Sequence, residues 1–452
     1  MKCYPLVLIL LMCCPVFALA QHDHMHNMEN MKDMPQGKTD NVDTLMRVGM
    51  THSYSLSLPM SRNGSGTGWL PDASPMHMFM KKASGWDMMF HVSIFLRQNF
   101  QDLGKAGSRG GKQFDAPDYF MMMAQHKVGG RGLFNFNLMM SLDNLTMGGF
   151  GYPLLFQSGE SWQGKPLVDR QHPHDLFSEL SMAYTYKVAD DLDLTGYLGY
   201  PGEPALGPVV FMHRLSALSN PDATLGHHWQ DATHITFGVA TIGMRYHKFK
   251  FEASSFTGRE PDENRYDFDR PRFDSYSCRI LFNPSENWAL QVSRGLIKSP
   301  EEVRPAENIV RNTASVIHAV NLGEGRYWTS TIACGLNEGT HAESSVLLES
   351  HLQIKRTAIY GRYEWVQKDT AELSIVSLSK EILNVNALTV GLSYHLLEGK
   401  AGIIALGSQA TIFKPDNAVK AIYGTHPYSM EVYLHFLPPL MNHKRSTSGH
   451  AM

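Results

Sequence analysis

The sequence predicts an all-β protein, a closed antiparallel transmembrane β-barrel of about sixteen strands, with fourteen to eighteen as the range. Three observations support this prediction. The chain begins with an export signal, the rest of it has a hydrophobic period of two, and its connections alternate between tight turns and long segments. A chain of 452 residues is long enough for one domain of this kind.

The first twenty residues have the composition of a Sec signal peptide. Lys2 supplies a positive charge, "PLVLILLMCCPVFALA" is apolar, and Ala18-Leu19-Ala20 provides the small residues of a cleavage site. The mature protein is therefore expected to begin at Gln21. No later segment approaches the roughly 18 consecutive apolar residues that a membrane helix needs.

Composition excludes some partners. The formal net charge is -3 and 18% of residues are charged, without the basic surplus that nucleic-acid binding requires. Cys278 and Cys334 are the cysteines that remain after the signal peptide, so the chain is not a disulfide scaffold. A single bridge between them is conceivable, but small packed side chains are the expected role.

Beyond Trp86 the chain consists of short runs in which apolar and polar residues alternate. In "LTVGLSYHL", for example, Leu388, Val390 and Leu392 share one face and Thr389 lies on the other. This period predicts strands with one apolar and one polar face. The expected strands are 86–101, 115–126, 133–142, 177–187, 192–200, 234–246, 248–256, 274–282, 288–296, 312–321, 326–335, 344–354, 357–366, 386–396, 400–410 and 428–437.

The connections between these strands are sorted by length. Tight turns such as "VADD", "HK" and "GEG" alternate with long segments at 143–176, 201–233, 257–273, 297–311, 367–385 and 411–427, and with shorter ones at 102–114 and 336–343. Outer-membrane barrels have short periplasmic turns and long outer loops. An even number of strands then places both termini in the periplasm.

The predicted organisation has four parts. They are a signal peptide at 1–20, a His/Met-rich periplasmic leader with a possible plug segment at 21–85, an outer-membrane barrel at 86–438, and a His/Met-containing tail at 439–452.

The leader has a composition typical of metal binding. Thioethers select Cu(I) and imidazoles suit Cu(II), so a mixed tract holds either ion. A disordered linker with accidental histidines is the alternative. The candidate ligands are His22, His24, Met25, His26, Met28, Met31 and Met34.

Methionine is concentrated in the first third of the chain, where 20 of the 26 lie at or before Met147. A second group begins at "PMHMFMKK" and continues over the first three strands. Because side chains alternate between the two faces of a strand, half of these methionines are expected to face lipid, where they serve only as apolar side chains. Core packing is the favoured interpretation for the others, with a thioether ladder in the lumen as the alternative. The group comprises Met76, Met78, Met80, Met88, Met89, Met121, Met122, Met123, Met139 and Met140.

A third group of candidates lies in the second and third long connections, in "DRQHPHDLF", "FMHR" and "HHWQDATHITF". Its imidazoles could converge at the outer mouth or on a loop folded into the lumen. Two or three of them would suffice for a zinc or copper site, with Asp169 or Asp175 holding a ligand in place. A hydrogen-bonded network that stiffens a plug is equally compatible. The candidate ligands are His172, His174, His213, His227, His228 and His234.

The motifs "PLVDRQHPHDLF", "PGEPALGP" followed by "FMHR", "HHWQDATHITFGV" and "FTGREPDENR" resemble a poorly characterised family of outer-membrane β-barrel proteins of Gram-negative bacteria. The resemblance runs from about residue 66 to 438 and implies the barrel fold and the outer membrane, but no catalytic residues. The leader at 22–34 is more loosely similar to copper-resistance protein B, which implies copper.

The first functional hypothesis is therefore a non-enzymatic barrel that binds and transports, or sequesters, copper, with outer-membrane lipid and a periplasmic copper-handling protein as partners. Passage of another small solute is the close alternative. A hydrolase acting on lipid or lipopolysaccharide, with Ser178, His174 and Asp175 as candidates by sequence proximity, is a second class. A structural or adhesive barrel is a third.

Overall fold

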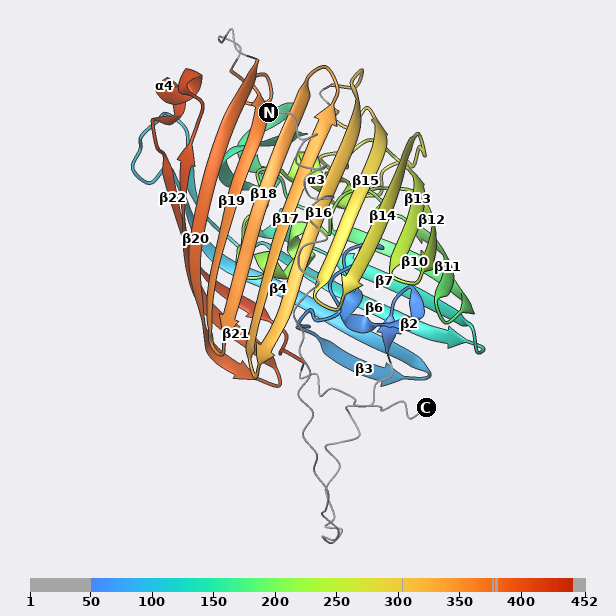
Figure 1. Cartoon of the computed structure of the whole chain (residues 1–452). Helices are drawn as coiled ribbons and strands as arrows, with labels where there is room; N and C mark the ends of the chain where they lie inside the picture. Colours follow the sequence, from blue (N-terminus) through green and yellow to red (C-terminus); the bar gives the residue numbers. More distant parts are fainter. Residues whose placement is uncertain (1–49, 303, 376–377, 379–380, 442–452) are drawn as a thin grey trace, which may run out of the picture. The chain divides into compact units, whose positions relative to one another are not determined.

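A computed structural model describes residues 50–441 of the chain, apart from residues 303, 376–377 and 379–380. The predicted signal peptide, the leader ligands at 22–34 and the tail beyond residue 441 lie outside the described residues. The described residues belong to one compact unit. Long antiparallel strands form its wall (Figure 1).

The strands of this wall form a closed antiparallel barrel. Pairing of β22 with β4, for instance Leu434 opposite Leu96, closes it. The strands are β3 (Phe79–Ala83), β4 (Trp86–Gln101), β5 (Gly111–Asp115), β6 (Asp118–Val128), β7 (Gly132–Met140), β10 (Phe177–Ala189), β11 (Leu192–Gly199), β12 (Val239–Tyr246), β13 (Phe249–Phe256), β14 (Ser275–Ser285), β15 (Trp288–Lys298), β16 (Asn308–Gly323), β17 (Arg326–Glu338), β18 (Ala342–Ile354), β19 (Thr357–Asp369), β20 (Ile382–Gly399), β21 (Gly402–Lys414) and β22 (Tyr428–Leu437).

Strand β4 is long enough to pair with two shorter strands along each of its edges. Its first residues pair with β3 and β6, and its last residues pair with β22 and β5. β3 and β22 therefore share one position in the wall, and β5 and β6 share another. The described barrel has sixteen strand positions, which confirms the predicted fold class.

Each predicted strand overlaps a strand of the barrel, and 86–101 and 428–437 match β4 and β22 residue for residue. The pattern did not predict β3, β5, or the hairpin of β8 (Tyr152–Trp162) and β9 (Lys165–Gln171). The prediction for 234–246 was wrong at its start, because β12 begins at Val239. The apolar Ile235 and Phe237 are buried in the preceding loop instead.

The two faces of the wall differ in polarity. On β20, Val390 is 57% exposed and Leu392 is 52% exposed, whereas their neighbours Thr389 and Ser393 are buried. The same alternation of exposed apolar and buried polar side chains recurs on β13, β18 and β21. An apolar outside around a polar inside is the pattern of a barrel in lipid, and the protein is an outer-membrane β-barrel.

The helical segments of the described residues are all short. None of them is long and apolar enough to cross a membrane. They are η2 (Met60–Arg62), α2 (Asp143–Thr146), η3 (Phe211–His213), η4 (Leu215–Ala217), α3 (His227–Gln230), η5 (Ala232–His234), η6 (Asn417–Val419) and α4 (Lys420–Tyr423). Cys278 on β14 and Cys334 on β17 are not joined by a disulfide.

The connections give the barrel two different ends. One carries only tight turns, such as those between β12 and β13 and between β20 and β21; the other carries the long loops. The chain enters the barrel wall and leaves it at the tight-turn end, where His77 forms a backbone bridge to Leu440. In outer-membrane barrels the tight-turn end faces the periplasm.

Residues 50–78, called the plug segment here, contact polar side chains on the inner face of the wall. This segment contains β1 (Thr51–His52) and β2 (Ser55–Pro59). The hydroxyl of Ser55 donates to Asp193 at 2.5 Å, and the ammonium of Lys250 donates to the carbonyl of Thr67 at 2.7 Å. The plug segment therefore occupies part of the lumen.

The lipid-facing assignment predicts the effect of one substitution. Val390→Arg places a guanidinium in hydrocarbon near the middle of β20, so it should lower the free energy of unfolding by roughly 2–4 kcal/mol. Urea unfolding of the protein in detergent micelles measures this change. The control Val390→Leu should stay within about 0.5 kcal/mol of the parent. An arginine variant as stable as the leucine variant would contradict the assignment.

Candidate metal centre

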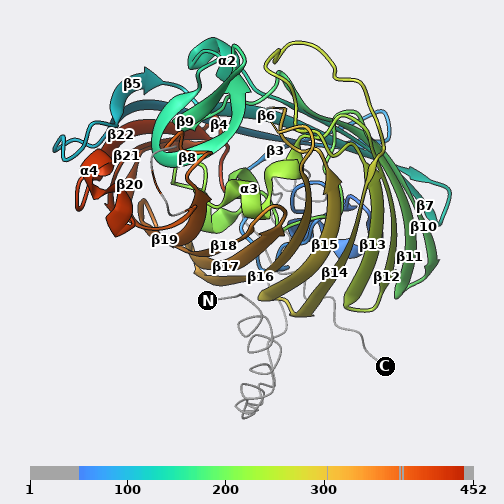
Figure 2. The ribbon, with the colours of Figure 1, turned by 90° about the horizontal axis from the view of Figure 1, so that it is seen from above.

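Two long connections fold into the barrel and lie beside each other there. One joins β7 to β10 and contains α2 and the β8–β9 hairpin; the other joins β11 to β12 and contains α3. Figure 2 shows α3, β8 and β9 inside the ring of strands. The amide of Gln157 on β8 donates to the carbonyl of Thr224 at 3.1 Å and so links the two connections.

Helix α3 is fixed to the wall through its backbone. The carbonyl of His228 accepts hydrogen bonds from Arg311 at 2.6 Å and from Asn337 at 2.9 Å. Any side chain in place of Gly335 on β17 would collide with the backbone of Trp229. The short helix therefore has little freedom to move along or away from the wall.

A buried network of ion pairs holds the β11–β12 connection to the wall at a second place. Arg214 donates to Asp231 and to Glu349 on β18, each at 2.9 Å. Glu349 also accepts from Arg362 on β19 at 2.9 Å. All of these side chains are almost fully buried. The network ties the connection to two strands at once.

Five of the six imidazoles predicted from the sequence gather where these connections meet. The rings of His227 and His228 lie 5.1 Å apart, measured between centroids, and His172 lies 5.9 Å and 5.8 Å from them. His234 lies 5.1 Å from His227, and His174 lies 5.4 Å from His234. We call these five residues the imidazole cluster.

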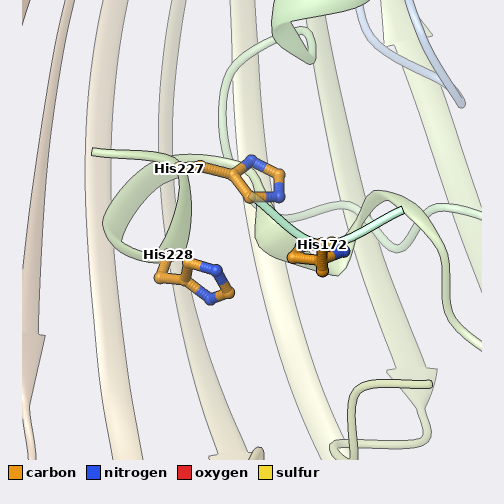
Figure 3. A group of neighbouring side chains, drawn as sticks. All are labelled: His172, His227 and His228. Atoms are coloured by element: carbon orange, nitrogen blue, oxygen red, sulfur yellow. The ribbon is translucent and has the colours of Figure 1, made fainter. Parts of the chain in front are cut away.

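Three members of the imidazole cluster have the spacing of metal ligands. His172, His227 and His228 each offer one ring nitrogen, and these nitrogens lie within 4.8 Å of one another. Figure 3 shows the three rings side by side, two from α3 and one from the segment after β9. Three imidazoles with an open position are a common ligand set for catalytic or exchangeable zinc and copper.

Each ring in the imidazole cluster is held through its Nδ1 atom. The Nδ1 neighbours are Glu160 for His172 (3.1 Å), Asp143 for His174 (2.6 Å), Asp231 for His227 (2.6 Å), Glu260 for His228 (3.4 Å), and the carbonyl of Asp231 for His234 (3.0 Å). A neutral imidazole that donates from Nδ1 keeps a lone pair on Nε2. Metal-ligating histidines are oriented in this way.

The Nε2 atoms of the five rings are all buried and have no hydrogen-bond partner among the described residues. A buried polar atom without a partner costs about 1–3 kcal/mol, and each such atom calls for an explanation. Five of them in one cluster fit a site that a cation completes.

Two of the rings have the protonation state that ligation needs, whereas, despite burial, the carboxylates of Asp143 and Glu260 raise the pKa of His174 and of His228 above the ordinary value. Burial lowers the pKa of His172 well below its ordinary value, and the positive charge of Arg265 acts in the same direction. Burial likewise lowers the pKa of His234. Both rings are neutral at pH 7, and only a neutral imidazole binds a metal ion.

The structure separates His213 from the other predicted ligands. Its ring contacts Tyr119 at 5.4 Å between centroids and borders a different cavity, lined also by His91. The grouping of all six imidazoles was therefore wrong for this one. The motif "FMHR" turns at η3, so that Phe211 contacts the rings of His174 and His227 while His213 faces elsewhere.

The carboxylates that orient the rings also differ from those predicted. Asp169 accepts from Arg109 and Tyr423, and Asp175 pairs with Arg265. Neither has a hydrogen bond to an imidazole among the described contacts. The orienting residues are Asp143 in α2, Glu160 in β8 and Glu260 in the β13–β14 loop. They lie outside the histidine motifs, so no sequence pattern linked them to the imidazoles. Asp231 alone lies within a histidine motif.

The residues considered for a hydrolase do not form a catalytic relay in the described structure. The hydroxyl of Ser178 donates to the backbone carbonyl of Asp175 at 3.1 Å. His174 is paired with Asp143, and Asp175 with Arg265. Ser178 therefore has no imidazole to activate it, which a serine nucleophile requires.

A small cavity adjoins the imidazole cluster on the side of the long loops. Its volume is about 50 Å³, and His228 forms part of its wall. Six carboxyl groups line it, from Glu260, Glu301, Glu307, Glu343, Asp369 and Glu372. Burial raises the pKa of Glu301 to about 8, so its carboxyl group is neutral at pH 7, and Arg304 and Arg311 offset part of the charge of the others. Low-dielectric walls with an excess of one charge concentrate the opposite ion, so the cavity attracts cations.

Comparison with known proteins shows likeness to solved outer-membrane barrels. No family model and no curated protein match the chain. OmpF of Salmonella typhi in complex with daunomycin is 8% identical, with 79% of this chain and 100% of that chain covered and a TM-score of 0.49. The anion-selective porin from Comamonas acidovorans is 9% identical, with 78% and 99% covered and a TM-score of 0.47. At these values the likenesses carry no argument about ligands.

The ion network predicts how the inner connection can be loosened. Glu349→Gln leaves Arg214 and Arg362 buried with one negative charge fewer, and loss of one partner of a buried pair costs about 3–5 kcal/mol. The connection at 200–238 should then detach in part and show new cleavage sites in limited proteolysis. Glu324→Gln, in the exposed turn between β16 and β17, is the matched control and should cleave like the parent. Identical fragments from both variants would refute the anchoring role.

Proposed function

We propose that this protein is an outer-membrane barrel that captures a divalent transition-metal ion in its lumen, with Cu(II) as the metal. The observation that carries the proposal is the imidazole cluster, in which five buried Nε2 atoms lack partners while each Nδ1 atom lies beside a carboxylate or a carbonyl. Protein sites are built this way when the ring must present a lone pair in a fixed direction.

The donor set favours copper among the metals of the periplasm and the medium. Imidazole nitrogens suit Cu(II) and Zn(II), and at a given nitrogen site Cu(II) binds most tightly of the divalent first-row ions. The leader ligands His22, His24 and His26, which lie outside the described residues, are expected to bind the same metal. A periplasmic copper-handling protein is the partner that such a leader would serve.

Capture fits the lumen better than free passage. The plug segment and the two inner connections occupy the described lumen, and the cavities beside the imidazole cluster measure about 50 Å³ each. A passive pore for other solutes needs a continuous aqueous channel. The acidic cavity beside His228 gives a cation access from the long-loop end, which faces the outside in barrels of this type.

The proposal predicts loss of Cu(II) from a triple variant. His172→Ala/His227→Ala/His228→Ala removes the three nitrogens that lie within 4.8 Å of one another, so one tightly bound Cu(II) per chain should disappear. Equilibrium dialysis gives the stoichiometry, and electron paramagnetic resonance of the bound Cu(II) reports nitrogen coordination. The full chain is used, so that the leader contributes equally to parent and variant.

The control for this experiment removes three imidazoles elsewhere. His126, His247 and His318 lie outside the imidazole cluster, beside a tight turn or among outer aromatic side chains. His126→Ala/His247→Ala/His318→Ala should bind Cu(II) as the parent does. Equal Cu(II) stoichiometry in the parent and the cluster variant would refute the proposal.

A second prediction concerns the residue that orients His228. Glu260→Gln removes the carboxylate beside its Nδ1 atom but keeps the size of the side chain. Loss of such a partner weakens metal binding by about 10- to 100-fold. Competition titration with a chelator measures the Kd for Cu(II). Glu263→Gln, in the same loop and without an imidazole partner among the described contacts, should leave the Kd unchanged.

A further inference from the structure

The lumen contains a second cavity with a different lining. It measures about 90 Å³ and lies at the tight-turn half of the barrel, between the start of β4 and the end of β22. A space of 10–15 Å³ already admits a water-sized particle, so this one has room for an ion. Thioethers reach it from the plug segment, the wall and η3, namely those of Met60, Met76, Met78, Met89, Met121, Met123 and Met212.

These methionines are placed by the pleat of the strands. Met89 on β4 is paired with Met123 on β6, and both are at most 3% exposed. Their neighbours Met88 and Met122 point to the opposite face, toward lipid. The structure therefore divides the methionines of the first strands into an outer set and an inner set. The sequence predicted this division, with core packing as the favoured role of the inner set and a thioether ladder as the alternative.

A concentration of thioethers is unusual for this lumen. Much of the remaining inner face carries polar side chains, as on β18, where Glu349, His351 and Gln353 point inward. Its apolar side chains there are mainly aliphatic or aromatic, as in Leu347, Val366 and Phe413. Methionine fills irregular gaps in apolar cores, and leucine does so equally well. Leucine, however, cannot ligate, whereas thioether sulfur is a soft ligand that selects Cu(I).

One imidazole of this cavity is available as a further ligand. The ring nitrogens of His213 have no hydrogen-bond partner within the part of the chain that the structure describes, and the ring borders the cavity. His77 is engaged at both nitrogens, with the carbonyl of Pro438 at 3.1 Å and the hydroxyl of Tyr327 at 3.2 Å. His435 is hydrogen-bonded to Ser93 at 2.9 Å, and His91 is hydrogen-bonded to the backbone of His77.

The charge of the lining distinguishes this cavity from the imidazole cluster. No carboxylate lines it among the described residues, and the one guanidinium in its lining, that of Arg214, is already paired with Asp231 and Glu349. Six carboxyl groups line the cavity beside His228. Neutral sulfur and nitrogen donors compensate a single positive charge more readily than two. The lining therefore favours a monovalent soft ion over a divalent one.

The two sites are neighbours inside the barrel. A third cavity, of about 50 Å³, is lined by His174 and Asp143 at one side and by Tyr119 and Met212 at the other. Tyr119 and Met212 also line the thioether cavity. Residues of η3 thus lie between the imidazole cluster and the thioether cavity.

We propose that the thioether cavity is a Cu(I) site, formed by the inner methionines with His213. It is separate from the imidazole cluster in its residues, its charge and the oxidation state that it selects. The site accounts for the inward methionines, for the unpartnered ring of His213 and for the absence of carboxylates in its described lining.

The test compares two methionine-to-leucine variants of the full-length protein. Met89→Leu/Met121→Leu/Met123→Leu removes inner sulfurs of β4 and β6 with little change in side-chain volume. Met88→Leu/Met122→Leu/Met140→Leu does the same on the outer face of β4, β6 and β7. Cu(I) is titrated under anaerobic reducing conditions against a chromophoric Cu(I) chelator. The inner variant should lose one Cu(I) per chain, or bind it at least tenfold more weakly, and the outer variant should match the parent.

A second variant keeps the test independent of core packing. His213→Ala should weaken Cu(I) binding about tenfold and remove the nitrogen contribution from the Cu X-ray absorption spectrum, while the heat-dependent shift in gel mobility confirms a folded barrel. Equal Cu(I) binding by the inner variant and the parent, or equal losses in the inner and outer variants, would overturn the proposal. The imidazole-cluster variant should retain this Cu(I), so failure of the Cu(II) proposal and failure of this one are distinguishable.

Discussion

The structure depends on one constraint, that every backbone amide and carbonyl in the hydrocarbon must find its partner within the protein. A single sheet meets this constraint only by closing on itself, and here β22 closes the ring on β4. Along each strand of the closed wall, successive side chains point alternately to the outer and to the inner face. The outer face must be apolar, and the inner face is then released from lipid and can carry charge, imidazole and sulfur.

On the inner face, buried ion pairs hold the segments that occupy the lumen. Arg97 pairs with Asp115 and Glu431 on the wall and with Asp222 on a loop. Arg279 pairs with Glu252 on the wall and donates to the loop carbonyl of Gly207 at 3.3 Å. Such buried pairs contribute little net stability, since desolvation offsets the attraction between the charges. Their effect is positional. They fix loops from the long-loop end against the wall, so that side chains on those loops keep a defined place.

Two kinds of donor are separated within this lumen. In the imidazole cluster, nitrogen donors lie beside carboxylates, an arrangement that suits a divalent ion. In the thioether cavity, sulfur donors lie in a lining without carboxylates among the described residues, which suits a monovalent soft ion. Residues of η3 separate the two, with Phe211 against the imidazoles and Met212 at the sulfurs. Under the proposals made here, each oxidation state of copper would have a site of matching donor chemistry in the same barrel.

The sequence alone determined the architecture of this protein, because strand pairing in a barrel follows local signals: a period of two, tight turns, and the spacing of long connections. It also singled out the histidines of the imidazole cluster by their density in two connections. Only the tertiary structure decided that five of them meet, that His213 joins the methionines, and that Asp143, Glu160 and Glu260 orient the rings. Those contacts join segments far apart in the chain, and their geometry comes from the way the loops pack inside the closed wall, which no local pattern encodes.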